Sequence, residues 1–292
     1  MKIDFKKKID FIIIDAQKSG TTTIANILNT SPNIFIPPEK EIPYFLDKKI
    51  QTLGWEKFIK IYFSKSKPHQ LIGTSTPQYM MYDYSFKLIK KKIPNVKLIA
   101  ILRDPIERLI SQYNMMKRFG KEKRDINTII RQEIKNIKYY RNLKFSNKTI
   151  KYITTSEYDR ILKSLKSLFK KKQLLFLDFN EIALSPNKIN KKICNFLNIE
   201  VSPIKITHSM RGGYQNYFDH NKYIQYAIKI FQLKKILPFY IIKKLRILIY
   251  KIDQINVRPN TSEKINKITK ENIKILKKHY KESYKIIKSI QK

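Results

Sequence analysis

Cysteine, histidine and glycine are scarce in this chain, and each scarcity excludes a class of protein. One cysteine, Cys194, among 292 residues rules out an internal disulfide framework and a cysteine-rich zinc site. Four histidines leave little for a multi-histidine metal centre, and six glycines with twelve prolines are too few for a collagen-like or low-complexity protein. The chain is therefore expected to be a globular protein that does not depend on disulfides.

Acidic residues are also scarce, with 23 Asp+Glu against 61 Lys+Arg and a formal net charge of +38. Hydrophobic residues still make up 42% of the chain, which is too many for a disordered protein. Lys outnumbers Arg 51 to 10, a bias that also arises by codon drift in an AT-rich genome. A basic surface attracts nucleic acid, phosphorylated cofactors, acidic glycans and lipid headgroups alike, so charge alone does not choose among them.

Long hydrophobic runs are missing. The N-terminal apolar run is broken by Asp10 and Asp15 and is followed by no small-residue cleavage site, unlike a signal peptide. The late apolar run from Ile236 is interrupted by basic residues at 243, 244 and 246. No run reaches the ~20 apolar residues that span a bilayer. We therefore expect a soluble, cytoplasmic protein, at most peripheral at a membrane.

Strand and helix patterns alternate over the first 200 residues. Short β-branched runs predict strands at 10–16, 71–75, 96–103 and 173–179. Helical spacing predicts helices at 21–30, at 86–93, from Pro105 onward, at 157–169 and at 186–197. This alternation predicts an α/β fold with a parallel sheet flanked by helices on both faces.

Residues 221–292 differ, with 19 basic and 4 acidic residues. Their pattern predicts helices, including a basic stretch at 222–251 and a final helix from Ile265. We predict a single domain over 1–292, with a cofactor-binding α/β core at 10–220 and a helical basic C-terminal layer at 221–292. The layer either packs on the sheet or offers a face for a membrane surface or an acidic ligand.

The segment DAQKSGTTT, residues 15–23, joins a predicted strand to a predicted helix through a turn at Gly20. Such a turn directs backbone N–H groups and the positive end of a helix dipole to one spot. The turn also supplies polar side chains: Lys18, Ser19, Thr21 and Thr22. It predicts a phosphate or sulfate site, although an ordinary capped helix start has the same pattern. Because Lys18 precedes Gly20, the segment is not a Walker A loop, which disfavours a nucleotide triphosphatase.

The segment KLIAILRDPIERLISQY, residues 97–113, places Arg103 at the carboxyl end of a predicted strand, with Ser111 two turns into the following helix. Ligands of parallel sheets bind at the carboxyl ends of strands. An Arg holds a phosphate by a forked contact that Lys does not provide. These residues predict a second phosphate site; the alternative is an Arg–Asp surface pair at a helix start.

Together, the two segments resemble the motifs of sulfotransferases that use 3′-phosphoadenosine 5′-phosphosulfate (PAPS). KSGTT resembles their 5′-phosphosulfate loop, and RDPIERLISQY resembles their 3′-phosphate motif. PEKEIPYF (38–45) and STPQYM (75–80) resemble segments of the heparan-sulfate-type branch, and HSMRGGYQN (208–216) resembles the loop over the adenosine. The resemblance implies the sulfotransferase version of the P-loop nucleotide-binding fold.

The resemblance also implies residue roles. Lys18 is expected to bind the 5′-phosphosulfate and to stabilise charge on the departing phosphate. The other expected cofactor contacts are Ser19, Gly20, Thr21 and Thr22 at the 5′-phosphosulfate, Arg103 and Ser111 at the 3′-phosphate, and Arg211, Gly212 and Gly213 over the nucleotide.

Glu41 aligns with the catalytic base of the heparan-sulfate-type branch, where a carboxylate takes the proton of the attacking hydroxyl. The alternative is a solvated charge in the polar PPEKE run, which also contains Glu39. A histidine base is disfavoured, because His69 lies in a polar loop and His208 in the expected nucleotide lid.

Ser75 departs from the pattern, since many heparan-sulfate-type enzymes carry a Lys at this place. A serine supplies no cation, so either Lys18 acts alone or another Lys compensates. This departure weakens any inference that the acceptor is a heparan-type polysaccharide.

The implied reaction moves a sulfuryl group from PAPS to a hydroxyl or amine of a carbohydrate or glycolipid and releases adenosine 3′,5′-bisphosphate, with no metal required. The alternatives are a nucleotide-dependent kinase, a basic nucleic-acid-binding protein without catalysis, and a family member that binds but no longer transfers. No base-reading module is visible, so we expect no specific nucleic-acid partner. Peripheral membrane contact through the basic C-terminal helices remains open.

Overall fold

The structure is a computed structural model that describes residues 8–14, 19–39, 41–201 and 268–291. The chain divides into two compact units, one of residues 1–112, 127–209 and 268–292, the other of residues 113–126 and 210–267. The sheet belongs to the first unit. Several predictions lie outside the described residues: those on Lys18, His208, Arg211, Gly212 and Gly213, and the helix at 222–251.

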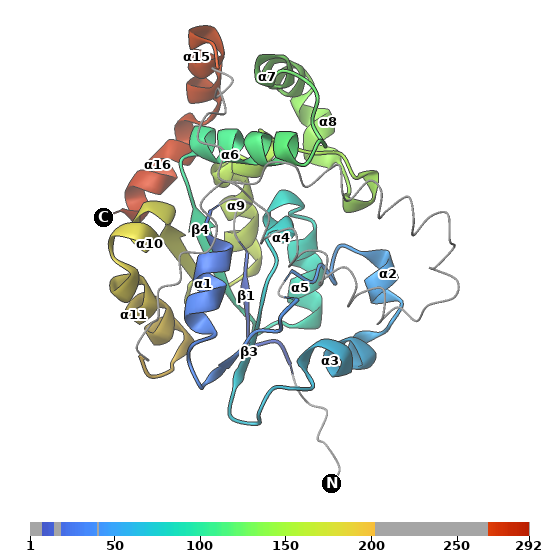
Figure 1. Cartoon of the computed structure of the whole chain (residues 1–292), viewed down its shortest axis with the longest axis vertical. Coiled ribbons are helices and arrows are strands. Elements are labelled where there is room, and N and C mark those ends of the chain that lie inside the picture. Colours follow the sequence, from blue (N-terminus) through green and yellow to red (C-terminus); the bar gives the residue numbers. More distant parts are fainter. Residues whose placement is uncertain (1–7, 15–18, 40, 202–267, 292) are drawn as a thin grey trace. The chain divides into compact units, whose positions relative to one another are not determined.

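Five parallel strands form a sheet in the order β2-β3-β1-β4-β5. Its middle strands β3, β1 and β4 are labelled in Figure 1. The strands are β1 (Phe11–Ile13), β2 (Ile34–Phe35), β3 (Leu71–Ser75), β4 (Lys97–Leu102) and β5 (Leu174–Asp178). Ile13 pairs with Ser75 on one side and with Ile99 on the other. The carboxyl ends of β3, β1 and β4 are therefore neighbours on one edge of the sheet, and the predicted parallel α/β architecture is confirmed.

Helices cover both faces of the sheet because successive strand residues point to opposite sides. Phe11 and Ile13 pack into a core with α1 (Thr21–Leu28), α10 (Phe179–Leu184) and α11 (Pro186–Leu197). Ile12 and Ile14 pack into a second core on the other face. The helices of that core are α3 (Trp55–Phe63), α4 (Gln78–Met81), α5 (Ser85–Lys92) and α9 (Tyr158–Leu168).

The remaining elements are mostly short. They are α2 (Lys48–Gln51), α6 (Pro105–Arg118), α7 (Ile126–Lys135), α8 (Ile137–Asn142), the 3₁₀ turns η1 (Phe145–Asn147), η2 (Thr154–Ser156) and η3 (Lys171–Gln173), and the C-terminal helices α15 (Lys270–His279) and α16 (Lys281–Ile290). The described C-terminal residues thus form two helices where the pattern predicts one. The break is at Tyr280, whose buried hydroxyl donates to the Ile153 carbonyl at 2.9 Å.

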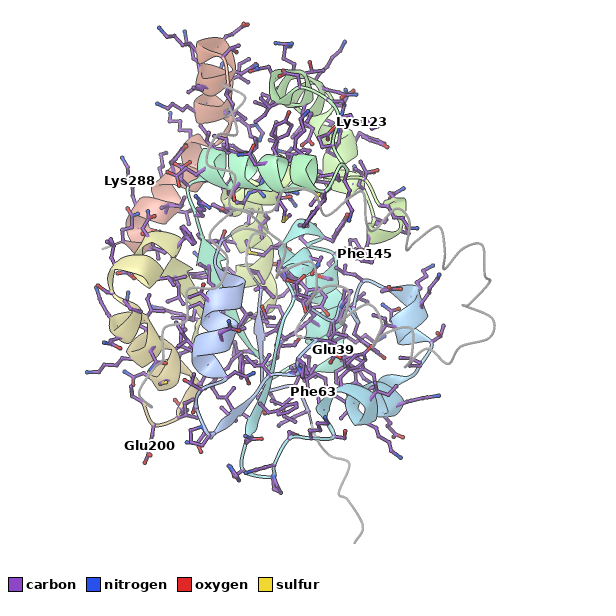
Figure 2. The ribbon with its side chains drawn as sticks, viewed as in Figure 1. Glu39, Phe63, Lys123, Phe145, Glu200 and Lys288 are labelled. Carbon is purple, nitrogen blue, oxygen red and sulfur yellow. The ribbon has the colours of Figure 1, made fainter. Side chains whose placement is uncertain are left out.

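Charged side chains such as Glu200 and Lys288 project outward, whereas Phe63 is wholly buried (Figure 2). Among the residues that the structure describes, none of the helices combines the length and apolar character that crossing a bilayer requires. In the second unit, the described residues 113–126 are tied locally, with the Glu122 carboxylate 2.7 Å from the Arg124 guanidinium.

Candidate active site

The turn between β1 and α1 is built around Gly20. Its φ of 91° lies in the left-handed region, which glycine adopts without steric cost. A Cβ at this position would lie 3.3 Å from the ring of Phe179 and 3.4 Å from Ile182, so the turn also packs closely against α10. At Gly20, no side chain that the structure describes caps the N-terminus of α1. The first N–H groups of α1 are therefore available to an anion.

Ser19 precedes this glycine and supplies a second, independent observation. Its side chain is wholly buried, and its hydroxyl has no hydrogen-bond partner among the described residues. A buried hydroxyl without a partner costs about 1–3 kcal/mol, a cost that a ligand oxygen at this place removes. The residues therefore fit a bound phosphate or sulfate. Thr21 and Thr22 form the first positions of α1; their side chains lie outside the description.

The segment RDP, residues 103–105, forms the turn between β4 and α6 and starts the helix. Arg103 follows the strand, and the Asp104 carboxylate accepts hydrogen bonds from the backbone N–H groups of Ile106 and Glu107, both at 2.9 Å. Asp104 is thus the N-cap of α6, and Pro105 occupies its first position, where a missing N–H has no cost. This turn fixes the direction in which Arg103 leaves the sheet.

The side chain of Arg103 lies over an aromatic ring. Its guanidinium carbon is 4.5 Å from the centroid of Phe179, and its Nη2 is 3.2 Å from the Glu107 carboxylate. Glu107 is 59% exposed, so this ion pair is weak and a phosphate can compete with it. The Arg103 carbonyl accepts from the Tyr158 hydroxyl at 2.9 Å. Ser111 lies two turns into α6 and is half-buried.

Phe179 connects the two predicted anion-binding turns. Its ring borders Gly20 and also lies beneath the guanidinium of Arg103. It is the first residue of α10, directly after β5. The sequence interpretation missed this role, because nothing local in the segment LDFN marks the ring as a contact for residues far away in the chain.

Hydrogen bonds join the segment that carries Glu41 to the residues that follow β3. The Tyr79 hydroxyl donates to the Ile42 carbonyl at 3.1 Å and accepts from the Phe45 N–H at 3.4 Å. The Thr76 hydroxyl donates to the same Ile42 carbonyl at 3.5 Å. Burial raises the pKa of Tyr79 well above its usual range, so the phenol stays protonated and keeps its donor. The motif STPQY therefore positions the backbone beside Glu41.

Glu41 itself is exposed, and its Oε2 accepts a hydrogen bond from Gln78 Nε2 at 3.3 Å. Ser75, at the end of β3, is wholly buried, and its hydroxyl lacks a partner among the described residues. His69, the rival base, is exposed in the turn before β3. It therefore stands near the amino end of that strand, at the edge opposite Ser75.

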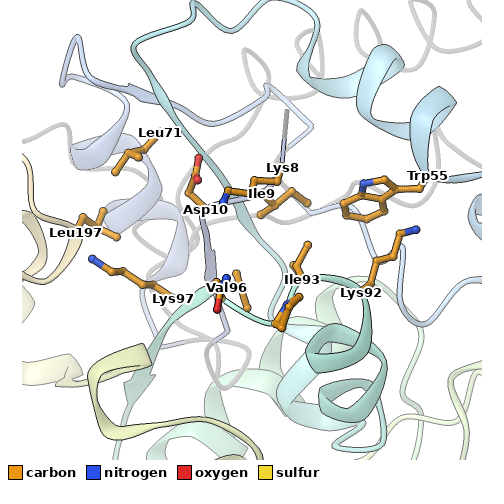
Figure 3. A pocket seen from close by; sticks show the side chains of 12 residues that line it. Lys8, Ile9, Asp10, Trp55, Leu71, Lys92, Ile93, Val96, Lys97 and Leu197 are labelled. Atoms are coloured by element: carbon orange, nitrogen blue, oxygen red, sulfur yellow. The ribbon is translucent and has the colours of Figure 1, made fainter. Parts of the chain in front are cut away.

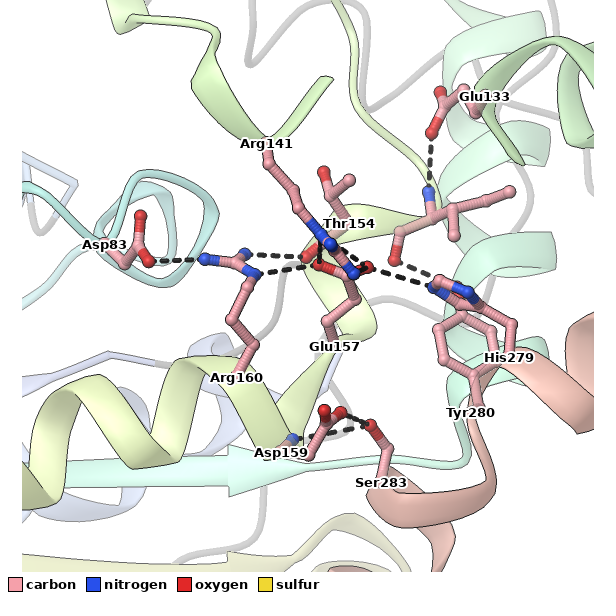
Figure 4. A network of polar contacts seen from close by, with 11 residues as sticks. Asp83, Glu133, Arg141, Thr154, Glu157, Asp159, Arg160, His279, Tyr280 and Ser283 are labelled. Carbon is pink, nitrogen blue, oxygen red and sulfur yellow. Dashed lines mark hydrogen bonds and ion pairs between the residues drawn. The ribbon is translucent and has the colours of Figure 1, made fainter. Parts of the chain in front are cut away.

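A buried carboxylate holds the elements behind the β4–α6 turn together (Figure 4). Glu157 is paired with Arg141 at 2.7 Å, Arg160 at 2.8 Å and His279 at 3.0 Å. Burial alone raises the pKa of Glu157, but the hydrogen bonds from His279, Arg141 and Arg160 outweigh burial and lower it to about 2. The network joins α8, α9 and α15 and fixes the neighbouring Tyr158, which bonds the Arg103 carbonyl.

Within the described ranges two further cations, Arg108 and Lys151, are fully buried, and neither was predicted from the sequence. Arg108 on α6 donates to Gln112 at 2.7 Å and to Ser156 and the Tyr152 carbonyl. Lys151 donates to the Met81 carbonyl, and burial lowers its pKa to about 8. Since Met81 ends α4, Lys151 contacts the far end of that helix and does not contact Ser75 directly. Both cations therefore serve the packing around the motifs.

A cavity of about 260 Å³ opens at the other edge of the sheet, by the amino ends of β1, β3 and β4 (Figure 3). Asp10 and Lys97 line it together with Trp55 and Lys92. The Asp10 carboxylate accepts from the Ile72 N–H at 2.8 Å, and Lys97 donates to the Phe196 carbonyl at 2.6 Å. These polar groups tie the sheet to its loops, and the cavity is separate from the candidate site at the carboxyl edge.

The structure is an α/β protein in which the two predicted anion-binding turns follow neighbouring strands of a parallel sheet. A family model described as the sulfotransferase domain matches residues 8–288. The chain therefore belongs to the sulfotransferase family.

Two relatives are similar to parts of this chain. It is 26% identical over 196 residues to heparan sulfate glucosamine 3-O-sulfotransferase 5 of Mus musculus, covering 64% of this chain and 53% of that protein. It is 34% identical over 105 residues to the membrane-associated sulfotransferase kil1 of Dictyostelium discoideum, covering 36% and 22%. The chain thus spans about half the length of the first relative and less of the second.

A sulfotransferase from Alicyclobacillus acidocaldarius superposes with a TM-score of 0.58 at 20% identity, covering 70% of this chain and 87% of that structure. This likeness establishes the sulfotransferase fold, as the resemblance in the motifs implied.

Proposed function

We propose that this protein transfers a sulfuryl group from PAPS to a hydroxyl or amine of a carbohydrate or glycolipid acceptor. Family membership supports the class of reaction. The observation that carries the site assignment is the position of Phe179, which borders both Gly20 and Arg103 and so brings the two predicted anion-binding turns to one ring. A ligand with two separated anionic groups fits such an arrangement.

PAPS supplies the sulfuryl group and a phosphate leaving group. The N–H groups at the start of α1 and the Ser19 hydroxyl are proposed to hold its 5′-phosphosulfate, and Lys18 to stabilise charge on the departing phosphate oxygen. Arg103 and Ser111 are proposed to hold the 3′-phosphate. From the resemblance of their segment to the loop over the adenosine, we propose that Arg211, Gly212 and Gly213 contact the nucleotide.

Glu41 is the proposed general base. The acceptor oxygen attacks sulfur in line, the S–O bond to the phosphate breaks, and the acceptor proton passes to the Glu41 carboxylate. The products are the sulfated acceptor and adenosine 3′,5′-bisphosphate. The exposed position of Glu41 and the bonds from Tyr79 and Thr76 to its segment support this role.

The proposal of a carbohydrate acceptor is supported by the similarity to relatives whose names include heparan sulfate glucosamine 3-O-sulfotransferase. Ser75 argues for an acceptor less anionic than heparan sulfate, because it places a neutral hydroxyl where many enzymes of that branch have a cation.

We also propose one sulfotransferase domain over residues 1–292, with the core at 10–220. In support, Ser283 of α16 donates to Asp159 of α9 at 2.6 Å.

Calorimetric titration tests the donor. We expect adenosine 3′,5′-bisphosphate to bind the full-length protein more tightly than ATP with Mg²⁺. Tighter binding of ATP with Mg²⁺ would favour a kinase, and binding only to DNA with a steep salt dependence would favour a nucleic-acid-binding protein.

A transfer assay identifies the acceptor. Labelled PAPS is offered with a panel of glycans, glycolipids and phenols, and the products are identified by mass spectrometry. Lys18→Ala is expected to abolish transfer.

A further inference from the structure

Two polar atoms near the segment of Glu41 lack partners. Oε1 of Gln78 and the hydroxyl of Ser75 are both shielded from water, and neither has a hydrogen-bond partner among the described residues. Each such atom carries a desolvation cost of about 1–3 kcal/mol that a bound group can remove. The inference drawn from them rests on the proposed function, because it concerns the acceptor of that reaction.

The orientation of the Gln78 carboxamide follows from its neighbour. An ionised carboxylate only accepts hydrogen bonds, so the amide must turn its NH₂ group toward Glu41, at 3.3 Å. Oε1 is therefore held on the other side of the carboxamide with its lone pairs unused. This oxygen needs a donor, such as an O–H or N–H group.

The backbone fixes both residues in place. Gln78 is the first residue of α4, between Thr76 and Tyr79, and these two hold the Ile42 carbonyl directly after Glu41. Glu41 and Gln78 are 37 positions apart in the chain, yet their side chains touch. The Glu41 carboxylate thus lies beside the Gln78 NH₂ group, and Gln78 Oε1 is a second hydrogen-bond acceptor on the far side of the same carboxamide.

We propose that Glu41 and Gln78 form a two-point clamp for an acceptor with hydrogen-bond donors on adjacent carbons. Glu41 receives the proton of the reacting hydroxyl, and Gln78 Oε1 accepts a hydrogen bond from the hydroxyl or amine on the next carbon. The substrate class is a vicinal diol or amino alcohol of a sugar ring. Binding rotates the half-buried Gln78 carboxamide out of its contact with Glu41, which frees the carboxylate for the reacting hydroxyl and brings Oε1 to the ring.

Selectivity follows from the buried oxygen. An acceptor with a single hydroxyl leaves Oε1 without a donor, and a site built around a hydrogen bond rejects the analogue that lacks it. Gln78 and Ser75 are both uncharged, so the clamp selects by hydrogen bonding and not by attraction to an anionic acceptor.

The test compares acceptor pairs with the full-length protein and labelled PAPS. The probes are trans-1,2-cyclohexanediol against cyclohexanol, and methyl glucopyranoside against its monodeoxy derivatives. The wild-type kcat/KM is expected to favour the acceptor with adjacent donors by about 10- to 100-fold. Gln78→Leu is expected to reduce this preference to about 3-fold or less, while Gln51→Leu, on α2, leaves it unchanged.

A second variant separates the clamp from folding. Gln78→Glu keeps an oxygen acceptor, so it should retain much of the preference for adjacent donors. It also places a like charge beside Glu41, which should raise the pKa of the base and move the acidic limb of the kcat profile to higher pH.

An equal preference in wild type and Gln78→Leu, or no preference in wild type, would overturn the clamp. An unmoved pH profile in Gln78→Glu would contradict the contact with Glu41. Absence of transfer to every acceptor would instead overturn the proposed function. Thermal melting and the affinity for adenosine 3′,5′-bisphosphate, both expected to be unchanged in Gln78→Leu, serve as controls for folding.

Discussion

The guanidinium of Arg103 stacks on Phe179 and pairs with Glu107. The residue leaves the sheet at a turn that the Asp104 carboxylate caps. A planar fork on an aromatic ring is prearranged for a phosphate, whereas an ammonium is a flexible point charge. The proposed contact with the 3′-phosphate therefore depends on the residue type as well as on the charge.

We expect Arg103→Lys to weaken binding of adenosine 3′,5′-bisphosphate by about 10-fold, and Arg103→Ala by more, since charge-assisted bidentate bonds are lost. Adenosine 5′-phosphate, which lacks the 3′-phosphate, should bind the variants and the wild type alike. Titration calorimetry measures both ligands, and Arg131→Ala, exposed on α7, is the matched control. A normal affinity of Arg103→Ala for the bisphosphate would refute the assignment.

Glu157 makes the stability of the folded protein depend on pH in the acidic range. Its pKa is about 2 in the folded protein against an ordinary value of 4.5, so the folded state binds fewer protons between these values. The stabilisation of the folded state by the ionised Glu157 is complete above pH 4.5 and is lost as the pH falls toward 2. The difference in pKa corresponds to about 3 kcal/mol of unfolding free energy.

Glu157→Gln should therefore be less stable than wild type at pH 6, because Arg141, Arg160 and His279 lose their carboxylate. The two proteins should converge in stability as the pH falls from 4.5 to 2. Urea unfolding at pH 6, 4, 3 and 2 measures this convergence. Parallel curves over that range would show that Glu157 does not carry the acid dependence.

At the scale of elements, β1 and β3 fit together through Gly73. A Cβ on this residue would lie 2.1 Å from Cζ of Phe11, closer than any real contact. The candidate site begins at the carboxyl ends of these two strands, which pair from Phe11 and Gly73 to Ile13 and Ser75.

Gly73→Ala is expected to destabilise the protein by about 1–3 kcal/mol, the usual cost of overpacking a core. Phe11→Leu should partly relieve the clash, so the double variant should lose less stability than the sum of the single ones. Thermal or urea unfolding of the four proteins measures this coupling. Additive losses would mean that the glycine is not required by the ring.

Long patterns and short turns were predictable from the sequence, but contacts between distant elements were not. The strand predicted at 71–75 and the helix predicted at 186–197 match β3 and α11 at both ends, because β-branched runs and Pro186 mark them locally. β2 has two residues, too few to show a period. The final helix divides at Tyr280, whose hydroxyl bonds the distant Ile153 carbonyl, a contact that no local pattern marks.

In the candidate site, too, some features were predictable from the sequence and others were not. The turns at Gly20 and Arg103 follow from local motifs, and the structure places them at neighbouring strands. Phe179 beside Gly20 and Gln78 beside Glu41 depend on tertiary packing over long stretches of chain, which no periodicity encodes.

At the scale of the whole molecule, the charge of +38 does not by itself select nucleic acid as the ligand. The described part of the C-terminal layer packs on the sheet domain, with Asn272 donating to Asn127 at 2.9 Å and Gln291 to Asp178 at 2.9 Å. The described C-terminal helices therefore contribute to the core as well as to the basic surface.

Single-turnover transfer of labelled sulfuryl from PAPS, compared between wild type and Glu41→Gln, tests the account most directly. The account predicts transfer by the wild type and a rate at least about 100-fold lower in Glu41→Gln, the usual contribution of a general base, with unchanged affinity for adenosine 3′,5′-bisphosphate. Full activity in Glu41→Gln would contradict the role of Glu41. Absence of transfer by the wild type would contradict the proposed reaction.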